Sequence, residues 1–311
     1  MRKWKSKVLL AKLETTYGTD AAPTGPANAI LAKRIELSPM EGEEVDRELE
    51  LPTFGASEKI PVGLHARLSF SVDLIGAAAA GTAPAFGPLL RACGLAEVIV
   101  ATTSVTYNPI TTGIESASLY LWVDGTRYRL RGSQGTAEIT LNAKGLPEIR
   151  FTFWGLWEQP TDVAQAVPAL AAQIARKPKP GSTANTPAFT INGVSMGLQS
   201  FKFDLGVKVE PRMLIRREAI IITDREETVD MTVEAVALSV LNPYQLAEAV
   251  TQVPISLVHG LGAGNVVTLT APTCQIKRPS GLSQSQDIVE WPLQAVPIPQ
   301  AGNDQFTLAF T

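Results

Sequence analysis

The sequence predicts a mainly β protein made of two similar halves. Residues 68–74 and 229–235 both alternate apolar and polar side chains, and both carry an acid at the sixth position. Strict alternation is typical of a strand with one buried and one solvated face, because successive side chains point to opposite sides of a sheet. The recurrence of this strand about half a chain length later favours one β-rich domain written twice, and a structural role over a catalytic one.

The elements of the first half begin with a strand at residues 33–37 and the alternating strand at residues 67–74. A short helix is predicted from Phe86 to Cys93, since Pro88 is compatible with the first turn of a helix and Gly94 with its end. The remaining elements of this half are predicted to be strands.

Two hairpins are predicted after this helix. Asp124-Gly125 lies between two apolar runs, and this dipeptide favours the tight turn that joins antiparallel strands. Residues 137–142 and 148–154 are expected to pair around Gly145. Both hairpins belong to the first half.

The second half repeats this order. Residues 200–205 correspond to the first strand, residues 228–238 to the alternating strand, and Tyr244 to Val250 to the helix, which Asn242 is expected to cap. Residues 288–296 form the closing strand. Residue identity between the halves is low, so the predicted duplication rests on the order and spacing of the elements.

Composition divides the chain into four parts. The segment 162–187 contains four prolines and is typical of a linker, while residues 14–30 are rich in Gly, Pro, Thr and Ala without an apolar period. We therefore predict an N-terminal arm at residues 1–32, a first domain at 33–161, the linker at 162–187 and a second domain at 188–311.

Charge and cysteine content exclude several classes of protein. The net charge of −3 argues against a dedicated nucleic-acid binder, which needs a surplus of Lys and Arg. Cys93 and Cys274 are the only cysteines, too few for a disulfide framework or a zinc site, so we expect both to be buried and reduced. The apolar stretch from Leu74 to Leu90 contains Gly and Pro and does not resemble a membrane helix. No cofactor or metal is expected, and the protein is expected to be cytosolic when made.

One catalytic pattern is present. Residues 193–197 match G-x-S-x-G around Ser195, and His259 follows, which is the chain order of an α/β-hydrolase. That mechanism needs the serine on a sharp strand-to-helix turn. The residues after Ser195 alternate like a strand instead, and Asn192-Gly193 favours a hairpin turn. We keep the serine hydrolase as an unfavoured alternative.

The two halves differ in charge at one corresponding place. The first half has an acid-rich connection, which lacks the ligand spacing and central Gly of an EF-hand and is either a solvated connection or an assembly surface. The corresponding segment of the second half is basic, and surfaces of opposite charge are complementary when copies meet. The candidate contact residues are Glu41, Glu43, Glu44, Asp46, Arg212, Arg216 and Arg217.

The N-terminal arm resembles that of a known family. Residues 14–24 (ETTYGTDAAPT) and the following Ala27-Asn28-Ala29-Ile30 are similar to the arm of major tail tube proteins of long-tailed bacteriophages. The Pro39-x-x-Gly42-Glu43 connection and Gly63 before the alternating strand add to the resemblance. Tyr17 and Asp20 of this arm are therefore further candidates for contacts between subunits or rings.

The resemblance implies β-sandwich tube domains, each with a flanking helix, that close into stacked rings. Six such domains form a ring in this family, so a chain with two of them needs three copies, a homotrimer with pseudo-sixfold symmetry. A decorating immunoglobulin-type second domain is the alternative to a second tube domain. The implied partners are the protein itself, tape-measure, tail-terminator and distal tail proteins, and duplex DNA in transit. The implied location is the virion tail, with the host cytoplasm during assembly.

A tube that passes DNA needs a lining that does not hold phosphates. Duplex DNA carries about one charge per 1.7 Å of axis, so a neutral or acidic lining is expected. The polar faces of the two repeated strands are the candidate lumen-facing residues: Ser69, Ser71, Asp73, Asp230, Thr232 and Glu234. The alternative placement is the outward solvent face of a half-buried sheet.

A β-rich receptor- or carbohydrate-binding virion module is a second alternative. Such a module presents exposed aromatic side chains in a pocket, and Trp154 and Trp157 are the available candidates. Both lie in or just after a predicted strand, which favours packing over ligand binding.

Overall fold

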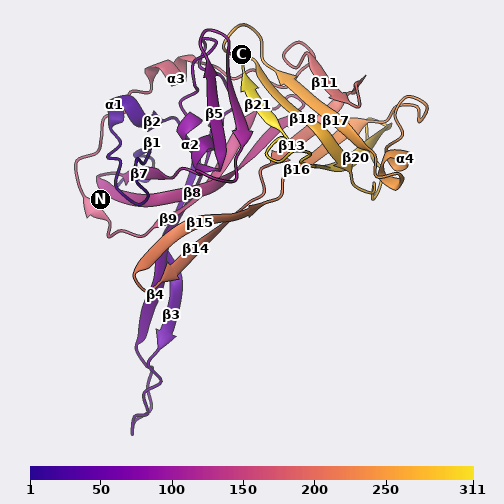
Figure 1. The fold of residues 1–311 in the computed structure, drawn as a ribbon. Coiled ribbons are helices and arrows are strands. Elements are labelled where there is room, and N and C mark those ends of the chain that lie inside the picture. Colours follow the sequence, from indigo (N-terminus) through magenta and orange to yellow (C-terminus); the bar gives the residue numbers. More distant parts are fainter.

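Strands form wherever apolar and polar residues alternate, and the prediction of a mainly β protein is confirmed. The computed structural model describes residues 1–311 (Figure 1). The strands from the N-terminus to the start of the predicted linker are β1 (Lys7–Leu13), β2 (Ala29–Ile30), β3 (Lys33–Asp46), β4 (Lys59–Asp73), β5 (Leu95–Val100), β6 (Ser104–Pro109), β7 (Ala117–Val123), β8 (Thr126–Asn142), β9 (Glu148–Leu156) and β10 (Thr161–Asp162).

The second half contributes eleven further strands, and four short helices complete the chain. The strands are β11 (Ala188–Ile191), β12 (Val194–Ser195), β13 (Leu198–Asp204), β14 (Val207–Leu214), β15 (Arg217–Arg225), β16 (Thr228–Glu234), β17 (Gln252–His259), β18 (Val267–Ile276), β19 (Ser283–Ser285), β20 (Ile288–Pro297) and β21 (Thr307–Phe310). The helices are α1 (Gly25–Asn28), α2 (Gly87–Ala92), α3 (Ala171–Ala175) and α4 (Pro243–Glu248).

One antiparallel sheet runs without a break through both halves. Its order is β3-β4-β9-β8-β13-β16-β20, and the step from β8 to β13 joins the first half to the second. Ladder hydrogen bonds therefore cross the boundary between the halves. Each half contributes the same sequence of neighbours: β3-β4-β9-β8 in the first, and β13-β16-β20 followed by the end of β18 together with β19 in the second.

The second layer of strands covers the apolar face of this sheet. In the first half it consists of β1, β7 and the beginning of β8, and in the second half of β11, β17, β18 and β21. The β5–β6 hairpin of the first half joins the second-half layer through β21, where Leu308 lies opposite Tyr107. This pairing of a first-half hairpin with a second-half strand connects the two halves a second time.

The core between the layers is continuous from one half to the other. Its centre in the first half is an aromatic cluster: the ring centroids of Phe70 and Phe151 are 5.7 Å apart, and those of Phe151 and Phe153 are 5.9 Å apart. Phe201 and Phe203 of β13 extend this core into the second half and are fully buried. These residues alternate with the polar ones along each strand, as the sequence predicts.

The predicted helices and turns occur where they were expected. Helix α2 spans Gly87–Ala92, and α4 follows the second alternating strand. The Asn242 side chain accepts a hydrogen bond from the backbone N–H of Gln245 at 3.1 Å, which is the expected N-cap. Asp124 and Gly125 both have positive φ, and they join β7 to β8.

Two long hairpins project from the sheet at corresponding places (Figure 1). One is the β3–β4 hairpin, and the other is the β14–β15 hairpin, which packs over β8 and β9 of the first half. Gly206 marks the bend between β13 and β14. Its φ is +56°, and a Cβ there would come within 1.9 Å of the Glu226 carbonyl oxygen, so only glycine fits the bend.

The N-terminal segment differs from the prediction. Residues 7–13, part of the predicted arm at 1–32, form the core strand β1, in which Leu10 is fully buried against β7. Only residues 14–24 wind along the surface before α1 and β2. The run of four apolar residues between two lysines is too short to indicate a strand by its pattern. Burial against β7 stabilises the strand in the folded chain.

The linker also contains structure. Helix α3 follows Leu170 in the predicted linker. Its Gln173 side chain forms two hydrogen bonds with the backbone at β2. The Nε2 atom donates to the Ala29 carbonyl at 2.7 Å, and the Oε1 atom accepts from the N–H of Leu31, the residue after the strand, at 2.9 Å. The linker is thus attached to the N-terminal segment beside α1 (Figure 1).

A buried carboxylate holds the first turn after β1. Glu14 is 8% exposed and accepts four hydrogen bonds: from the N–H groups of Gly18 (2.7 Å) and Gly132 (2.8 Å), and from the hydroxyls of Ser116 (2.7 Å) and Ser118 (2.8 Å). Gly132 lies in β8 at the point where that strand bends between the two layers. Glu14 therefore links the arm, β7 and the bend of β8.

Candidate tube lining and assembly surfaces

The polar side of the continuous sheet is one surface that spans both halves. Asp73 lies opposite Glu148, Glu148 opposite Thr140, Thr140 opposite Lys202, and Lys202 opposite Asp230. Since cross-strand partners share a face, these side chains form a row across β4, β9, β8, β13 and β16. The polar sides of the two repeated strands are thus parts of one face.

Most cations of this face are paired with carboxylates. Lys202 Nζ lies 2.8 Å from Glu138 Oε2, and Arg150 lies 3.7 Å from Glu36. Two further pairs, Lys33 with Asp73 and Arg34 with Glu148, connect β3 to β4 and β9. The sequence did not indicate these pairs, because the register that brings the partners together is a property of the assembled sheet.

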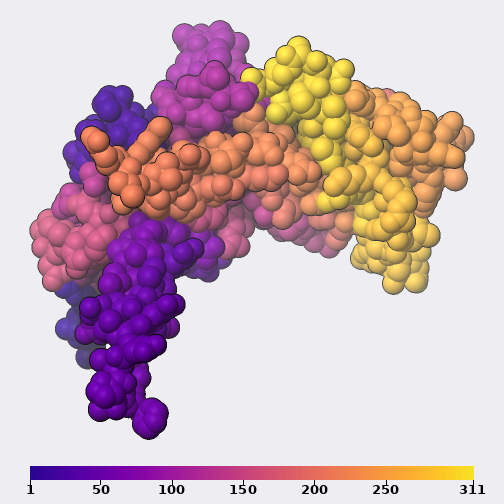
Figure 2. All heavy atoms as spheres, turned by 60° about the horizontal axis from the view of Figure 1, so that its bottom comes forward, coloured from indigo at the N-terminus to yellow at the C-terminus, as the bar shows by residue number.

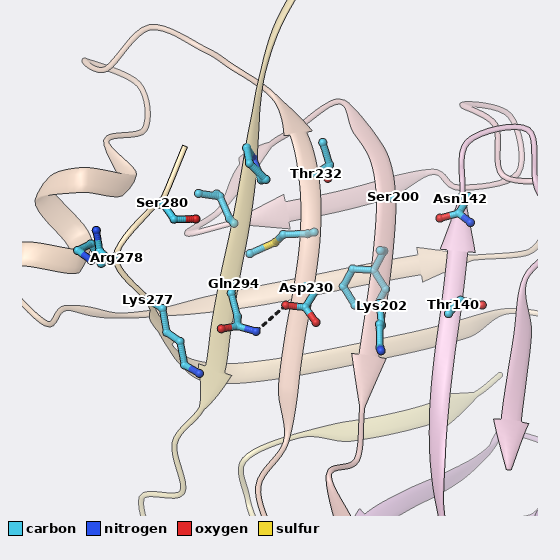
Figure 3. Close-up of a pocket in the computed structure, with 14 residues that line it drawn as sticks. Thr140, Asn142, Ser200, Lys202, Asp230, Thr232, Lys277, Arg278, Ser280 and Gln294 are labelled. Carbon is cyan, nitrogen blue, oxygen red and sulfur yellow. Dashed lines mark hydrogen bonds between the residues drawn. The ribbon is translucent and has the colours of Figure 1, made fainter. Parts of the chain in front are cut away.

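A shallow hollow of about 910 Å³ lies on the second-half part of this face (Figure 3). Its floor is built from Thr140, Lys202, Asp230 and Gln294, which point to the same side from four adjacent strands. Gln294 Nε2 donates to Asp230 Oδ1 at 2.7 Å. The hollow is lined mainly by polar side chains, as expected of a solvent-exposed surface.

The candidate lumen residues are not equally accessible. Ser69 and Ser71 are buried, and the Ser71 hydroxyl accepts a hydrogen bond from Arg34 Nη2 at 3.1 Å. Asp73, Asp230 and Thr232 are partly exposed, and Glu234 is exposed. The longer charged side chains, rather than the two serines, form the outer surface of this face. Its assignment to a lumen stays a prediction.

The acidic and basic candidates lie on the two projecting hairpins (Figure 2). In the β3–β4 hairpin, Glu41 is paired with His65 and Arg67, and Glu44 lies 3.9 Å from Lys59. Glu43 and Asp46 have no ion pair. In the β14–β15 hairpin, none of the three arginines is paired with a carboxylate: Arg212, Arg216 and Arg217. Their role in assembly stays a prediction.

Comparison with known proteins decides the family. A family model described as phage tail tube protein matches residues 4–290, which is nearly the whole chain, including both halves. The chain belongs to the phage tail tube protein family. No curated protein matches the sequence. The family is one of structural proteins of the phage tail, and the family that the N-terminal arm resembles is confirmed as the family of this chain.

Tyr17 and Asp20 of this tail tube protein have partners within the chain. The Tyr17 hydroxyl accepts from the N–H of Ile220 at 2.6 Å, so the arm is attached to β15 of the second half. Asp20 accepts a hydrogen bond from the Tyr120 hydroxyl and lies 3.6 Å from Arg129. Their predicted contacts to other subunits remain predictions.

The tube-family fold does not provide the geometry of a serine hydrolase. Asn192 and Gly193 form a turn between β11 and β12, and Ser195 lies on β12, where it pairs with Thr190. No helix directly follows Ser195, and the chain continues into β13. His259 Nδ1 is 2.9 Å from Thr186 Oγ1. The G-x-S-x-G match is therefore a hairpin and not a nucleophile elbow.

Burial of His259 predicts a pH dependence of stability. Desolvation lowers the pKa of His259 below its ordinary value of 6.5. Its contribution to stability is therefore complete above pH 6.5 and is lost as the pH falls toward the folded-state pKa, by up to about 1.4 kcal/mol per pH unit. His259→Gln should reduce the loss of stability between pH 7 and pH 5, measured by urea denaturation. His65→Gln is the control, and an unchanged pH dependence in His259→Gln would refute the assignment.

The tryptophans proposed for ligand binding are in a sheet environment. Trp154 lies on β9 opposite Arg67 and Gln134, and both Trp154 and Trp157 are half-buried. Neither lines the polar hollow. No helix of the structure has the length and apolar content needed to cross a bilayer.

Proposed function

We propose that this protein forms rings that stack into the phage tail tube, with the polar face of the continuous sheet turned to the lumen. The observation that carries the proposal is the β8–β13 junction, which joins two sets of strands of the same order into one sheet. Repetition of that junction between chains extends the sheet until it closes on itself. Closure removes the free strand edges, which otherwise promote aggregation.

The number of copies follows from the repeat. The two halves supply the corresponding strands, the two corresponding hairpins, and helices α2 and α4. A family ring of six tube domains then needs three chains, a homotrimer with pseudo-sixfold symmetry. We propose domains at 33–161 and 188–311, with β1 added to the first. The proposed partners are other copies of the chain, and the tape-measure, terminator and distal proteins of the tail, assembled in the host cytoplasm.

The charges of the polar face support a conduit for duplex DNA. Eight carboxylates of the face (Glu36, Asp73, Glu138, Glu148, Asp204, Asp230, Glu234 and Glu290) stand against seven cations (Lys33, Arg34, Arg67, Arg150, Lys202, Lys277 and Arg278), so the face carries no excess of positive charge. Five of these cations are within ion-pair distance of a carboxylate, whereas Lys277 and Arg278, at the free edge of the second half, are not. Unpaired Lys or Arg would bind phosphates and release counterions. A lining in which the next copy of the chain covers Lys277 and Arg278 lets DNA slide.

The opposite charges of the two hairpins support alternation around the ring. Within one chain the β14–β15 hairpin lies over the first half, and the Met213 side chain comes within 3.8 Å of a Cβ built on Gly63 at the base of the β3–β4 hairpin. Repetition between chains places an acidic hairpin beside a basic one at each boundary. Complementary charge then favours the correct order of subunits.

Microscopy of the purified protein tests the proposal. We expect negative-stain images to show rings or tubes, and the mass of single rings to equal three chains. Arg216→Glu/Arg217→Glu should greatly reduce assembly while leaving the fold intact by circular dichroism, because the acidic hairpin then faces like charge. Lys3→Glu/Lys5→Glu, on the exposed N-terminus, is the control. A protein that stays monomeric under all conditions would refute the ring, and normal assembly of the arginine variant would refute the role of the hairpins.

A further inference from the structure

The internal junction between β8 and β13 defines a specific geometry. Thr140 lies opposite Lys202, and Ile139 lies opposite Phe203. The apolar members of the junction are buried: Ile139 is 4% exposed and Phe203 is fully buried. On the polar side, Lys202 pairs with Glu138 across the junction at 2.8 Å. The junction thus combines ladder hydrogen bonds, an apolar contact and an ion pair.

One side of this junction has a counterpart in β3. Glu36 lies opposite Ser69, and Lys202 lies opposite Asp230, where Ser69 and Asp230 occupy the same position of the repeated strand. By the same step, Leu37 corresponds to Phe203, because Leu68 and Val229 are their partners. β3 is therefore the counterpart of β13 in the first half.

The other side of the junction has a counterpart in β19. Thr140 lies opposite Glu148, which lies opposite Asp73. Ser283 lies opposite Glu290, which lies opposite Glu234, the counterpart of Asp73. Ser283 therefore occupies the place of Thr140. The residue before it, Leu282, occupies the place of Ile139.

Both counterparts have a free edge at opposite ends of the sheet. β3 pairs only with β4, and β19 pairs only with β20. Leu282 is 64% exposed where its counterpart Ile139 is buried, and Leu37 is half-buried where Phe203 has no exposed surface. The side chain that contacts the β3 edge is Lys7, whose Nζ donates to the Ile35 carbonyl at 3.3 Å. Lys7 belongs to β1, but its ammonium group covers part of the β3 edge, where a charge opposes unspecific pairing and can move aside.

Charge at the two edges is complementary. Lys277 and Arg278, between β18 and β19, line the hollow and have no carboxylate partner. Glu36, on the β3 edge, has only the long 3.7 Å contact with Arg150. In the internal junction the cation is on β13 and the carboxylate is on β8. Between copies the carboxylate would be on β3, the counterpart of β13, and the cations would lie beside β19, the counterpart of β8.

We propose that β3 of one copy pairs antiparallel with the Lys277–Ser285 edge of the next copy, in the register of the internal junction. Glu36 then lies opposite Ser283, and Leu37 packs on Leu282. This inference rests on the proposed ring and specifies its contact between chains. The partner is a second copy of this chain, and the surface is the pair of free edges.

Paired cysteines test this register. The variant carries Glu36→Cys and Ser283→Cys, and it is treated with a mild oxidant after assembly. We expect covalent dimers and trimers of the chain on non-reducing gels, because the two side chains meet only between copies. Cys93 and Cys274 are buried and form no cross-link of their own. Each single variant can give at most a dimer, by random collision, and no trimer.

Two further variants make the result decisive. Thr140→Cys/Lys202→Cys, at the equivalent position of the internal junction, should cross-link within one chain and stay monomeric on the gel. Glu36→Cys/Glu248→Cys, with the second cysteine on exposed α4, should give no trimer. Intact rings in the microscope without the Glu36–Ser283 cross-link would overturn the register and leave the ring standing. Absence of rings in the wild-type protein would overturn the ring itself and this contact with it.

Discussion

Replacing Glu14 by Ala is expected to be the most destabilising single substitution outside the aromatic core. The buried carboxylate accepts from two backbone N–H groups and two hydroxyls, all between 2.7 and 2.8 Å. The hydroxyls can rotate toward other acceptors, but the N–H groups of Gly18 and Gly132 cannot. A buried donor left without a partner costs about 1–3 kcal/mol, so we expect a loss of about 3–5 kcal/mol.

Urea denaturation of the unassembled chain measures this loss. Glu14→Gln keeps one acceptor oxygen and should lose roughly half as much. Glu43→Ala, on an exposed position of the β3–β4 hairpin without an ion pair, is the matched control and should change stability by less than about 0.5 kcal/mol. If Glu14→Ala were as stable as Glu43→Ala, the carboxylate would not hold the arm and the β8 bend together.

Replacing Asp230 by Lys is expected to have the largest effect on DNA delivery. Asp230 is on the polar face between Lys202 and Gln294, and the substitution sets an unpaired lysine beside Lys202, so that two cations adjoin. Every chain of every stacked ring would present them to the passing phosphates. We expect normal tubes and a drop in infective titre of at least about tenfold, because each added phosphate contact strengthens binding and slows sliding.

Complementation of a phage that lacks its own tube protein measures this effect, with tail length and DNA release scored separately. Asp230→Asn removes the charge without reversing it and should have a small effect. Glu248→Lys makes the same change of charge on exposed α4, whose residues do not line the hollow, and should leave the titre unchanged. Normal delivery by Asp230→Lys tubes would show that this face is not the lumen.

Local patterns predicted the elements well. The alternation of residues 229–235 specified β16 and which side of it is buried, and the Asn242 cap and Asn192-Gly193 turn formed as expected. These features depend on neighbours within a few residues, which the sequence contains directly. Strand β1 was missed because its apolar run of four residues shows neither a helical nor a strand period. The segment forms a strand because it pairs with β7.

The candidate site was predicted in part. Asp73, Asp230 and Glu234 were placed on the polar side of their strands, but the covering of Ser71 by Arg34 and the Lys202–Glu138 pair were not foreseen. Arg34 reaches Ser71 from a bulge in β3, and Lys202 meets Glu138 through a pairing of strands about 60 residues apart in sequence. Neither register can be derived from local periodicity.

The sequence by itself determined that the protein is β-rich, that one strand is written twice, and that the copies carry acids at matching positions. Only the tertiary structure decided that the two copies belong to a single sheet, through the β8–β13 junction, and that its two ends are free. The physical reason is the range of the interactions. Alternation reports which side of a strand is buried, whereas the partner of a strand edge is selected by long-range ladder hydrogen bonds and packing, which leave no local pattern.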